Sequence, residues 1–307
     1  MGSAMSHCHR RRCRRRRQPT TTDPEAIAER NWSDMHVDVL SLIFAKLGTI
    51  EVITGAGLVC HSWLDAAMLP HLWQSVDMSN HKVVEEMDGN VLCAMAKVAV
   101  DRSCGRLETF VGKGFVTDDL LNHIGNRAPS LKGLRLISCS AIFNAGVAGA
   151  IKKFPLLDDL EISLCSNVYG KNVFNTIGKS CPQLTRFKCC ANSFYARQLY
   201  SRNDVVGIKA MTKFKSLQLF GSNLTKRGLT AILDSCPHLE SLDIRNCYNI
   251  QMDNTLQGMC AGIKSLKLPH DSIDDYEYKD KLPICSCECH DVPQFGCLVT
   301  ISHGGFS

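Results

Sequence analysis

A pattern of apolar residues that returns between Leu107 and Asp271 constrains the fold more than any other feature. Each copy reads apolar-x-x-apolar-x-apolar-x-x-(Cys, Asn or Ser), with the last position weak in the outermost copies. The copies begin at Leu107, Leu131, Leu157, Leu184, Phe214, Leu239 and Ile263, at intervals of 24, 26, 27, 30, 25 and 24 residues. Alternating apolar positions predict a short strand in each copy. One such unit cannot bury its own apolar face, so we expect consecutive units to stack and share one core.

The second half of each unit predicts a helix that ends before the next strand. In the clearest copy Leu229, Ile232 and Leu233 form one apolar stripe at helical spacing. A proline stands two residues before the next strand's first apolar position at Pro129, Pro155, Pro182 and Pro237. Proline cannot continue a helix, so it marks the stop. Strand, loop and helix at this period indicate an α/β leucine-rich-repeat solenoid of parallel strands and helices, with about six or seven repeats in residues 107–271.

Three of the 17 cysteines recur at one register position, namely Cys139, Cys165 and Cys247. Metal or redox chemistry is one interpretation, and a small buried residue that fills each turn is the other. One cysteine per coil of about 26 residues cannot converge on a single tetrahedral metal. We therefore predict buried thiols and no metal site in the repeats.

Strand alternation predicts which repeat residues face the inner, strand-lined surface, because the neighbours of buried positions point the other way. The predicted substrate-binding set mixes both charge signs and comprises Arg135, Asp159, Glu161, Arg186, Lys188, Gln218, Phe220, Asp243, Arg245 and Lys267. Phe220 is its one aromatic side chain, which we expect to be exposed and to anchor a protein partner.

Residues 31–78 follow a helical period instead. Leu40, Ile43, Phe44 and Leu47 lie at i, i+3, i+4 and i+7, which predicts one apolar stripe on a helix. Further apolar segments predict two more short helices. Three short helices give a marginal core, so a partner is expected to stabilise such a module.

The order of residues in this region resembles an F-box. The motif comprises Met35, Leu40, Ile43, Phe44, Leu47, Val59, Cys60, Trp63, Pro70, Leu72 and Trp73. The resemblance implies that these residues form the module's core or bind a Skp-type adaptor, and through it cullin and RING subunits. Met35 and His36 stand where the family usually has Leu-Pro. The repeats resemble the cysteine-containing repeats of F-box proteins, and residues 203–250 are similar to plant members.

The resemblance implies a non-catalytic substrate-recognition subunit of an SCF-type (Skp–cullin–F-box) ubiquitin ligase. The F-box would bind the adaptor, and the repeats would recruit a target protein for ubiquitination and proteasomal degradation. A repeat scaffold that acts outside a ligase is the alternative. No phosphate loop, nucleophile elbow or zinc-protease motif indicates a catalytic residue, and no cofactor is expected. Residues 79–106 are expected to form a linker helix.

The two ends of the chain differ from the rest in composition. The net charge is +5, but residues 1–22 hold seven arginines and no acid, which leaves −2 for the remainder. We therefore predict no nucleic-acid binding by the body and a disordered leader over 1–30, which could also act in nuclear import. No apolar run indicates a membrane span or a secretory signal, so we expect the nucleus or the cytoplasm. Residues 272–307 are expected to form a flexible tail, whose candidate ligands Cys285, Cys287, Cys289 and His290 lack the paired spacing of a zinc site.

Overall fold

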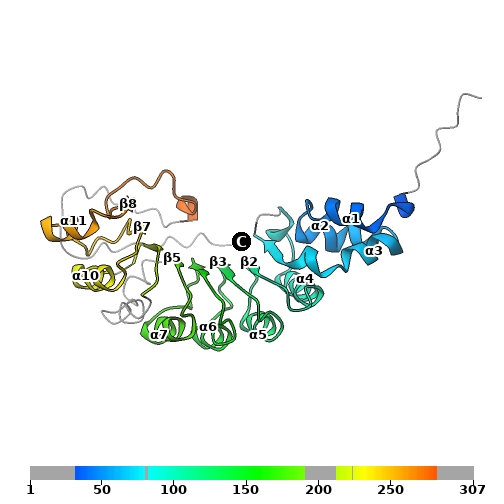
Figure 1. Ribbon diagram of the computed structural model, residues 1–307, viewed down its shortest axis with the longest axis horizontal. Helices are drawn as coiled ribbons and strands as arrows, with labels where there is room; N and C mark the ends of the chain where they lie inside the picture. The colour runs from blue at the N-terminus through cyan, green and yellow to red at the C-terminus, as the bar shows by residue number, and fades with distance from the viewer. Residues whose placement is uncertain (1–31, 80–81, 191–211, 223, 282–307) are drawn as a thin grey trace, which may run out of the picture.

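The repeats form one curved parallel sheet with helices along one side. The computed structural model describes residues 32–79, 82–190, 212–222 and 224–281. Within these residues, eight parallel strands follow one another in chain order, each paired with the next. They are β1 (Ser75–Met78), β2 (Thr109–Lys113), β3 (Gly133–Ile137), β4 (Asp159–Ser163), β5 (Arg186–Cys190), β6 (Ser216–Phe220), β7 (Ser241–Asp243) and β8 (Ser265–Lys267). Figure 1 shows the strands on the inner side of an arc and the helices outside it.

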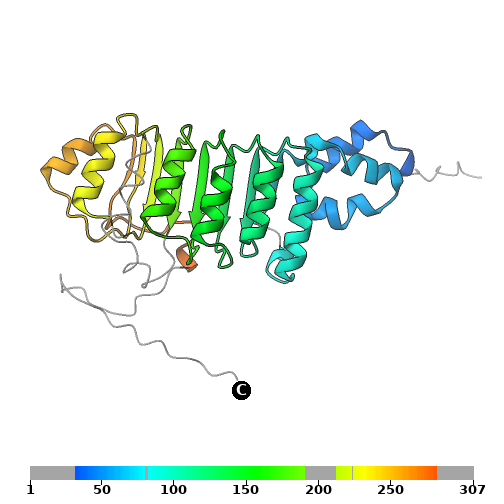
Figure 2. The ribbon, with the colours of Figure 1, turned by 90° about the horizontal axis from the view of Figure 1, so that it is seen from below.

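A helix follows most strands and lies on the convex face. These helices are α4 (Gly89–Arg102), α5 (Asp118–Arg127), α6 (Asn144–Ile151), α7 (Lys171–Ser180), α10 (Lys226–Ser235) and α11 (Asn254–Cys260). Figure 2 looks at this face and shows the helices arranged side by side across the strands. Side-chain caps begin several of them, since Thr117, Thr225 and Asp253 accept hydrogen bonds from backbone N–H groups of the first turn. The predicted α/β leucine-rich-repeat solenoid is confirmed.

Each repeat leaves its strand through a tight corner. The residue directly after the strand has a positive φ at Gly114, Ser138, Leu164 and Gly221, and Asn246 adopts it three residues after β7. Glycine takes this backbone conformation without strain, whereas a side chain costs about 1 kcal/mol there. The corner turns the chain away from the sheet and toward the helix.

The recurrent cysteines fill these corners. Cys139 and Cys247 are fully buried, and Cys165 is nearly so. The Cys139 thiol donates to the Ile137 carbonyl at 3.2 Å, and the Cys247 thiol donates to the Leu219 carbonyl at 2.8 Å. The prediction of small buried residues in the turns is therefore confirmed.

The N-terminal helices pack onto the first strand of the sheet. They are α1 (Val37–Phe44), α2 (Thr49–Thr54) and α3 (His61–Ala67). The 3-10 segment η2 (Ala56–Leu58) lies between α2 and α3, and η3 (Pro70–Trp73) connects α3 to β1. One continuous apolar core runs from Leu40 through the repeats to Cys260. The helical module and the solenoid are therefore not separated by a solvated linker.

The sheet begins earlier in the chain than the pattern from Leu107 indicates. Strand β1 falls at the end of the predicted helical module and pairs with β2 in parallel. Helix α4, expected to be a linker helix, packs against α5 as the convex helix of this first unit. The physical reason is that Trp73, Val76 and Met78 also satisfy apolar-x-x-apolar-x-apolar, and all three are buried. No helix among the described residues is long and apolar enough to cross a membrane.

Candidate functional sites: the F-box helices and the concave sheet face

The structure divides the F-box residues, which the sequence leaves undivided, into core and surface. Leu40, Phe44 and Trp73 are buried. Met35, Cys60, Trp63, Pro70 and Leu72 are partly buried, and Ile43, Leu47 and Val59 are exposed. Of the apolar stripe predicted for the first helix, Leu40 and Phe44 therefore belong to the core of the module, while Ile43 and Leu47 lie on its surface. The assignment of individual residues to adaptor binding stays a prediction.

Indole rings hold the module together from the inside. The rings of Trp63 and Phe44 meet edge to face with centroids 5.5 Å apart. Trp63 Nε1 also donates to the Trp32 carbonyl at 3.0 Å, which fixes the chain that enters α1. At the start of α1 the Asp38 backbone N–H donates to the imidazole of His36 at 3.3 Å. His36, at the position where the family usually has proline, thus acts as the helix N-cap.

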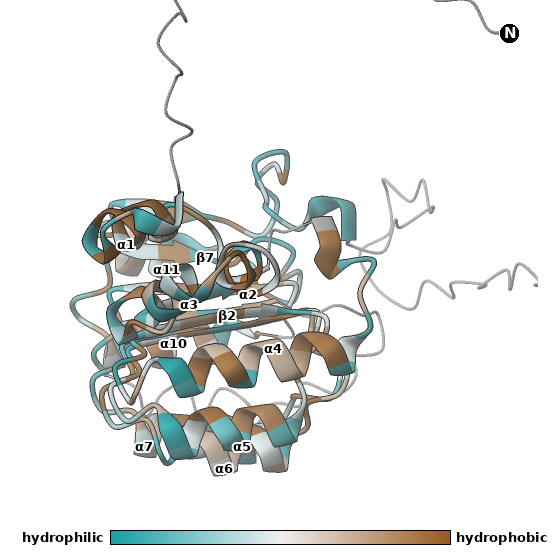
Figure 3. Ribbon diagram, turned by 90° about the vertical axis from the view of Figure 1, so that its right-hand side faces the viewer, coloured by the Kyte–Doolittle hydropathy of each residue, from teal (hydrophilic) through white to brown (hydrophobic). Residues whose placement is uncertain are grey.

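The outside of the module is unusually apolar for a protein surface. Among the described residues, fifteen large hydrophobic side chains are exposed, and ten of them lie between Trp32 and Met68. Leu58 is 73% exposed, Leu42 is 68% exposed and Val59 is 58% exposed. Figure 3 shows that most residues along α1 are apolar. A concentration of exposed apolar groups on one small module marks a protein-interaction surface.

A cleft of about 360 Å³ lies beside this surface. It opens between the end of α1, the start of α2, segment η3 and strand β1, and its lining includes Leu47, Thr49, His71, Leu72 and Gln74. The exposed Leu47 stands at its edge. The cleft gives the apolar surface a concave region, and its lining residues do not form a recognisable catalytic arrangement.

The junction between the module and the solenoid is a packed core with Trp73 at its centre. The ring is 2% exposed, and its Nε1 donates to the Ala67 carbonyl at 2.9 Å. The Arg102 guanidinium of α4 lies over the ring, 5.2 Å from its centroid. Partial burial lowers the pKa of Arg102. A residue of the F-box motif therefore joins the two parts of the chain.

Eight of the ten predicted inner-face residues occupy two rows across the sheet, and Phe220 and Arg245 lie two positions farther along the chain than Gln218 and Asp243. The strand register aligns Arg135, Glu161, Lys188, Gln218, Asp243 and Lys267 in one row, and Asp159 and Arg186 in the row before it. Arg135 and Arg186 are exposed, whereas Asp159, Lys188, Gln218 and Lys267 are partly buried. Asp159 lies between the two arginines, 3.4 Å from Arg135 and 3.3 Å from Arg186.

Four members of the predicted set are buried, so the expectation of an open inner surface is wrong for them. They are Glu161, Phe220, Asp243 and Arg245. The cause is residues 272–281, which we call the strap. The strap runs from β8 back across the concave face, and Figure 1 shows it on the side opposite the convex helices. The prediction of a flexible tail from residue 272 is therefore wrong for these ten residues, while Cys285–His290 lies outside the described residues.

Phe220 in particular is a stacking partner within the chain and not an exposed anchor. It is 1% exposed, and its ring stacks on that of Tyr276 with centroids 3.7 Å apart. The strap's second aromatic residue, Tyr278, donates from its hydroxyl to Glu161 Oε1 at 2.7 Å. Burial raises the pKa of both tyrosines, and for Tyr278 the charge of Glu161 adds to the effect. In the sequence, the local signal for this packing is the alternation of aromatic and acidic residues in Tyr276, Glu277 and Tyr278.

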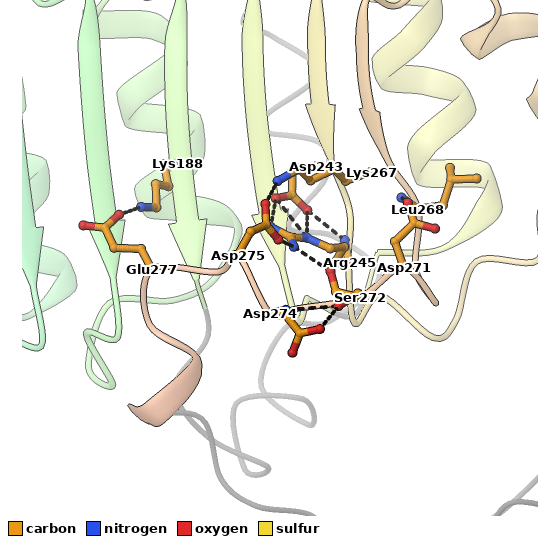
Figure 4. A network of polar contacts seen from close by, with 10 residues as sticks. All are labelled: Lys188, Asp243, Arg245, Lys267, Leu268, Asp271, Ser272, Asp274, Asp275 and Glu277. Carbon is orange, nitrogen blue, oxygen red and sulfur yellow. Dashed lines mark hydrogen bonds and ion pairs between the residues drawn. The ribbon is translucent and has the colours of Figure 1, made fainter.

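Ion pairs at Asp275 and at Glu277 hold the strap on the sheet (Figure 4). Arg245 donates to Asp243 Oδ2 at 2.8 Å and to the Ser272 carbonyl at 2.8 Å, and it also binds Asp275. Lys267 binds the other oxygen of Asp275. These hydrogen bonds from Lys267 and Arg245 hold the pKa of Asp275 at about 2. Farther along, Glu277 lies 2.6 Å from Lys188.

Within the described part of the chain no group of three or more His, Cys, Asp or Glu side chains could hold a metal ion. The concave face instead offers paired charges and aromatic rings. The arrangement is suited to binding another polypeptide.

The fold and these two surfaces define a leucine-rich-repeat solenoid that carries an F-box module. No family model matches the chain. The F-box protein SKIP19 of Arabidopsis thaliana is 37% identical over 249 residues, which cover 80% of this chain and 80% of that protein. F-box/LRR-repeat protein 22 of the same plant is 36% identical over 251 residues, which cover 81% of this chain and 80% of that protein.

A third relative is longer. F-box/LRR-repeat protein 23 of Arabidopsis thaliana is 37% identical over 250 residues, which cover 80% of this chain but only 55% of that protein. This chain therefore matches little more than half the length of that relative. Together the relatives show that the chain belongs to the plant F-box/LRR-repeat family.

Proposed function

We propose that this chain is the substrate-recognition subunit of an SCF-type ubiquitin ligase. In this role the F-box binds a Skp-type adaptor, which connects it to the cullin and RING subunits, and the repeats recruit a target protein. The observation that carries the proposal is the set of exposed apolar side chains on the F-box module, which includes Leu42, Leu58 and Val59. Such a surface needs a partner, and membership of the F-box family supports a Skp-type adaptor.

The chain's contribution to ubiquitin transfer is non-catalytic. The adaptor would hold the F-box end, and a bound target would lie on the repeats. The continuous core across Trp73 supports a fixed distance between the two. Such a subunit accelerates transfer by raising the effective concentration of target lysines near the charged conjugating enzyme. We further propose that it acts in the nucleus or cytoplasm, which imaging of a fluorescent fusion would test.

The test is co-purification of the full chain with a plant Skp-type adaptor. We expect Leu42→Asp and Leu58→Asp each to weaken adaptor binding by at least about tenfold, because a carboxylate would be desolvated in an apolar interface. Leu156→Asp is the matched control, because Leu156 is a 49% exposed leucine in the repeats. Adaptor binding that is absent from the wild type, or unchanged in both F-box variants, would contradict the proposal.

A further inference from the structure

The strap lies on the sheet as a bound peptide would lie. Tyr276 and Tyr278, two residues apart, point into the concave face and are 4% and 6% exposed. Asp274 and Glu277 lie toward solvent, and the strap's 3-10 segment η5 (Lys279–Lys281) has no buried residue. The two tyrosines, together with the partly buried Ile273, therefore make the apolar contact of this ten-residue segment.

Beneath the strap lies an apolar row that is separate from the main core. Ile137, Leu164, Cys190 and Phe220 form one cluster with the two tyrosines. The main core lies on the other side of the strands, between the sheet and the convex helices. Removal of the strap would therefore expose this row and leave the core of the solenoid in place.

Cations surround the apolar row and face the acids of the strap. Lys188 pairs with Glu277, while Arg245 and Lys267 both bind Asp275. The Lys188 ammonium also lies 4.4 Å from the centroid of the Tyr278 ring. The groove also holds two acids, because Glu161 pairs with Lys188 and Asp243 pairs with Arg245. Three cations against two acids leave an excess of one positive charge beside the apolar floor, which fits a segment that alternates aromatic and acidic residues.

We propose that this row is a docking groove for an acidic, aromatic segment of a target protein, and that the strap is its built-in occupant, which the target segment displaces. The inference rests on the proposed function, since it names the kind of target that the receptor recruits. Its physical basis is the complementarity of charge and apolar contact between groove and strap. The strap follows β8 after only four residues, so it competes at an effective concentration of about 1 mM.

The test uses the full chain in complex with its adaptor and a fluorescent peptide with the sequence of residues 271–281. Fluorescence anisotropy measures binding to the wild type and to the double variant Tyr276→Ala/Tyr278→Ala. We expect the double variant to bind the peptide about 10–100-fold more tightly, because the competing strap has lost its anchors. Tyr248→Ala, which removes a 52% exposed tyrosine outside the strap, should bind as the wild type does.

A second variant that should release the strap is needed in case the double-tyrosine variant misfolds. Asp275→Lys keeps both tyrosines but places a third cation beside Arg245 and Lys267, which should release the strap. Circular dichroism identifies which variants retain the fold. If neither folded variant binds the peptide better than the wild type, the inference is wrong.

A double-mutant cycle tests the position of the peptide. In the open double-tyrosine variant, we combine Lys267→Met with a peptide that carries Asp275→Asn. If the peptide lies where the strap lies, each change alone weakens binding several-fold. The loss of affinity with both changes is then smaller than the product of the two single losses. Lys264→Met is the control, because Lys264 pairs with Glu240 and not with the strap. Additive losses would show that the peptide binds elsewhere and would overturn the inference. Adaptor binding is measured in a separate co-purification experiment. A negative result for peptide binding in the groove would therefore not contradict the proposed function.

Discussion

Replacement of Trp73 by alanine should weaken the F-box and the first repeat together. Truncation of a fully buried tryptophan costs about 3–5 kcal/mol through lost transfer free energy and the cavity that remains. The Arg102 guanidinium loses the ring beneath it, which adds about 0.5–1 kcal/mol. We therefore expect a loss of about 4 kcal/mol, a large share of the 5–15 kcal/mol typical of a folded domain.

The milder variant Trp73→Phe keeps a ring and loses mainly the hydrogen bond to the Ala67 carbonyl, so it should cost about 1–2 kcal/mol. Urea unfolding of the full chain measures both changes. Amide hydrogen exchange locates them, and we expect α3 and α4 to lose protection by similar free energies. Trp32→Ala is the matched control, since the Trp32 side chain is 58% exposed and should contribute less than about 1 kcal/mol.

Two results would refute this reasoning. A cost below about 1 kcal/mol for Trp73→Ala would mean that the ring does not support the core. Loss of protection in α3 with no change in α4 would mean that the F-box and the repeats have independent cores, and that the receptor hinges at Trp73.

Two further predictions concern side chains whose pKa is raised by burial. In an alkaline titration followed by tyrosinate absorbance, Tyr276 and Tyr278 should ionise at a higher pH than a free tyrosine does, because burial raises the pKa of both. A tyrosine pKa that is raised on folding contributes stability that is present below about pH 10 and is lost as pH rises further. The strap should therefore detach above about pH 10, and simultaneous ionisation of all tyrosines would contradict its burial. Burial likewise raises the pKa of the Cys247 thiol to about 11, so it should resist alkylation in the native protein. The exposed Cys104 should react rapidly under the same conditions, and equal rates would contradict the packed corners.

The sequence predicted the elements whose signal is local and periodic. The repeat of apolar positions determined parallel strands and convex helices, because a buried stripe can be read from neighbouring residues alone. It also determined the buried cysteines of the corners. The first strand was missed although Trp73, Val76 and Met78 carry the pattern, because 34 residues separate Trp73 from Leu107.

The tertiary structure alone decided how open the concave face is. Alternation correctly indicates that Phe220 and Glu161 point away from the main core, but it does not show what covers them. Tyr278 reaches Glu161 across 117 positions of sequence, and no local period encodes a contact of that range. The same holds for the F-box stripe, where Leu40 is buried and Ile43 is exposed on one helix. Burial there depends on what packs against each side of the helix, which only the folded chain determines.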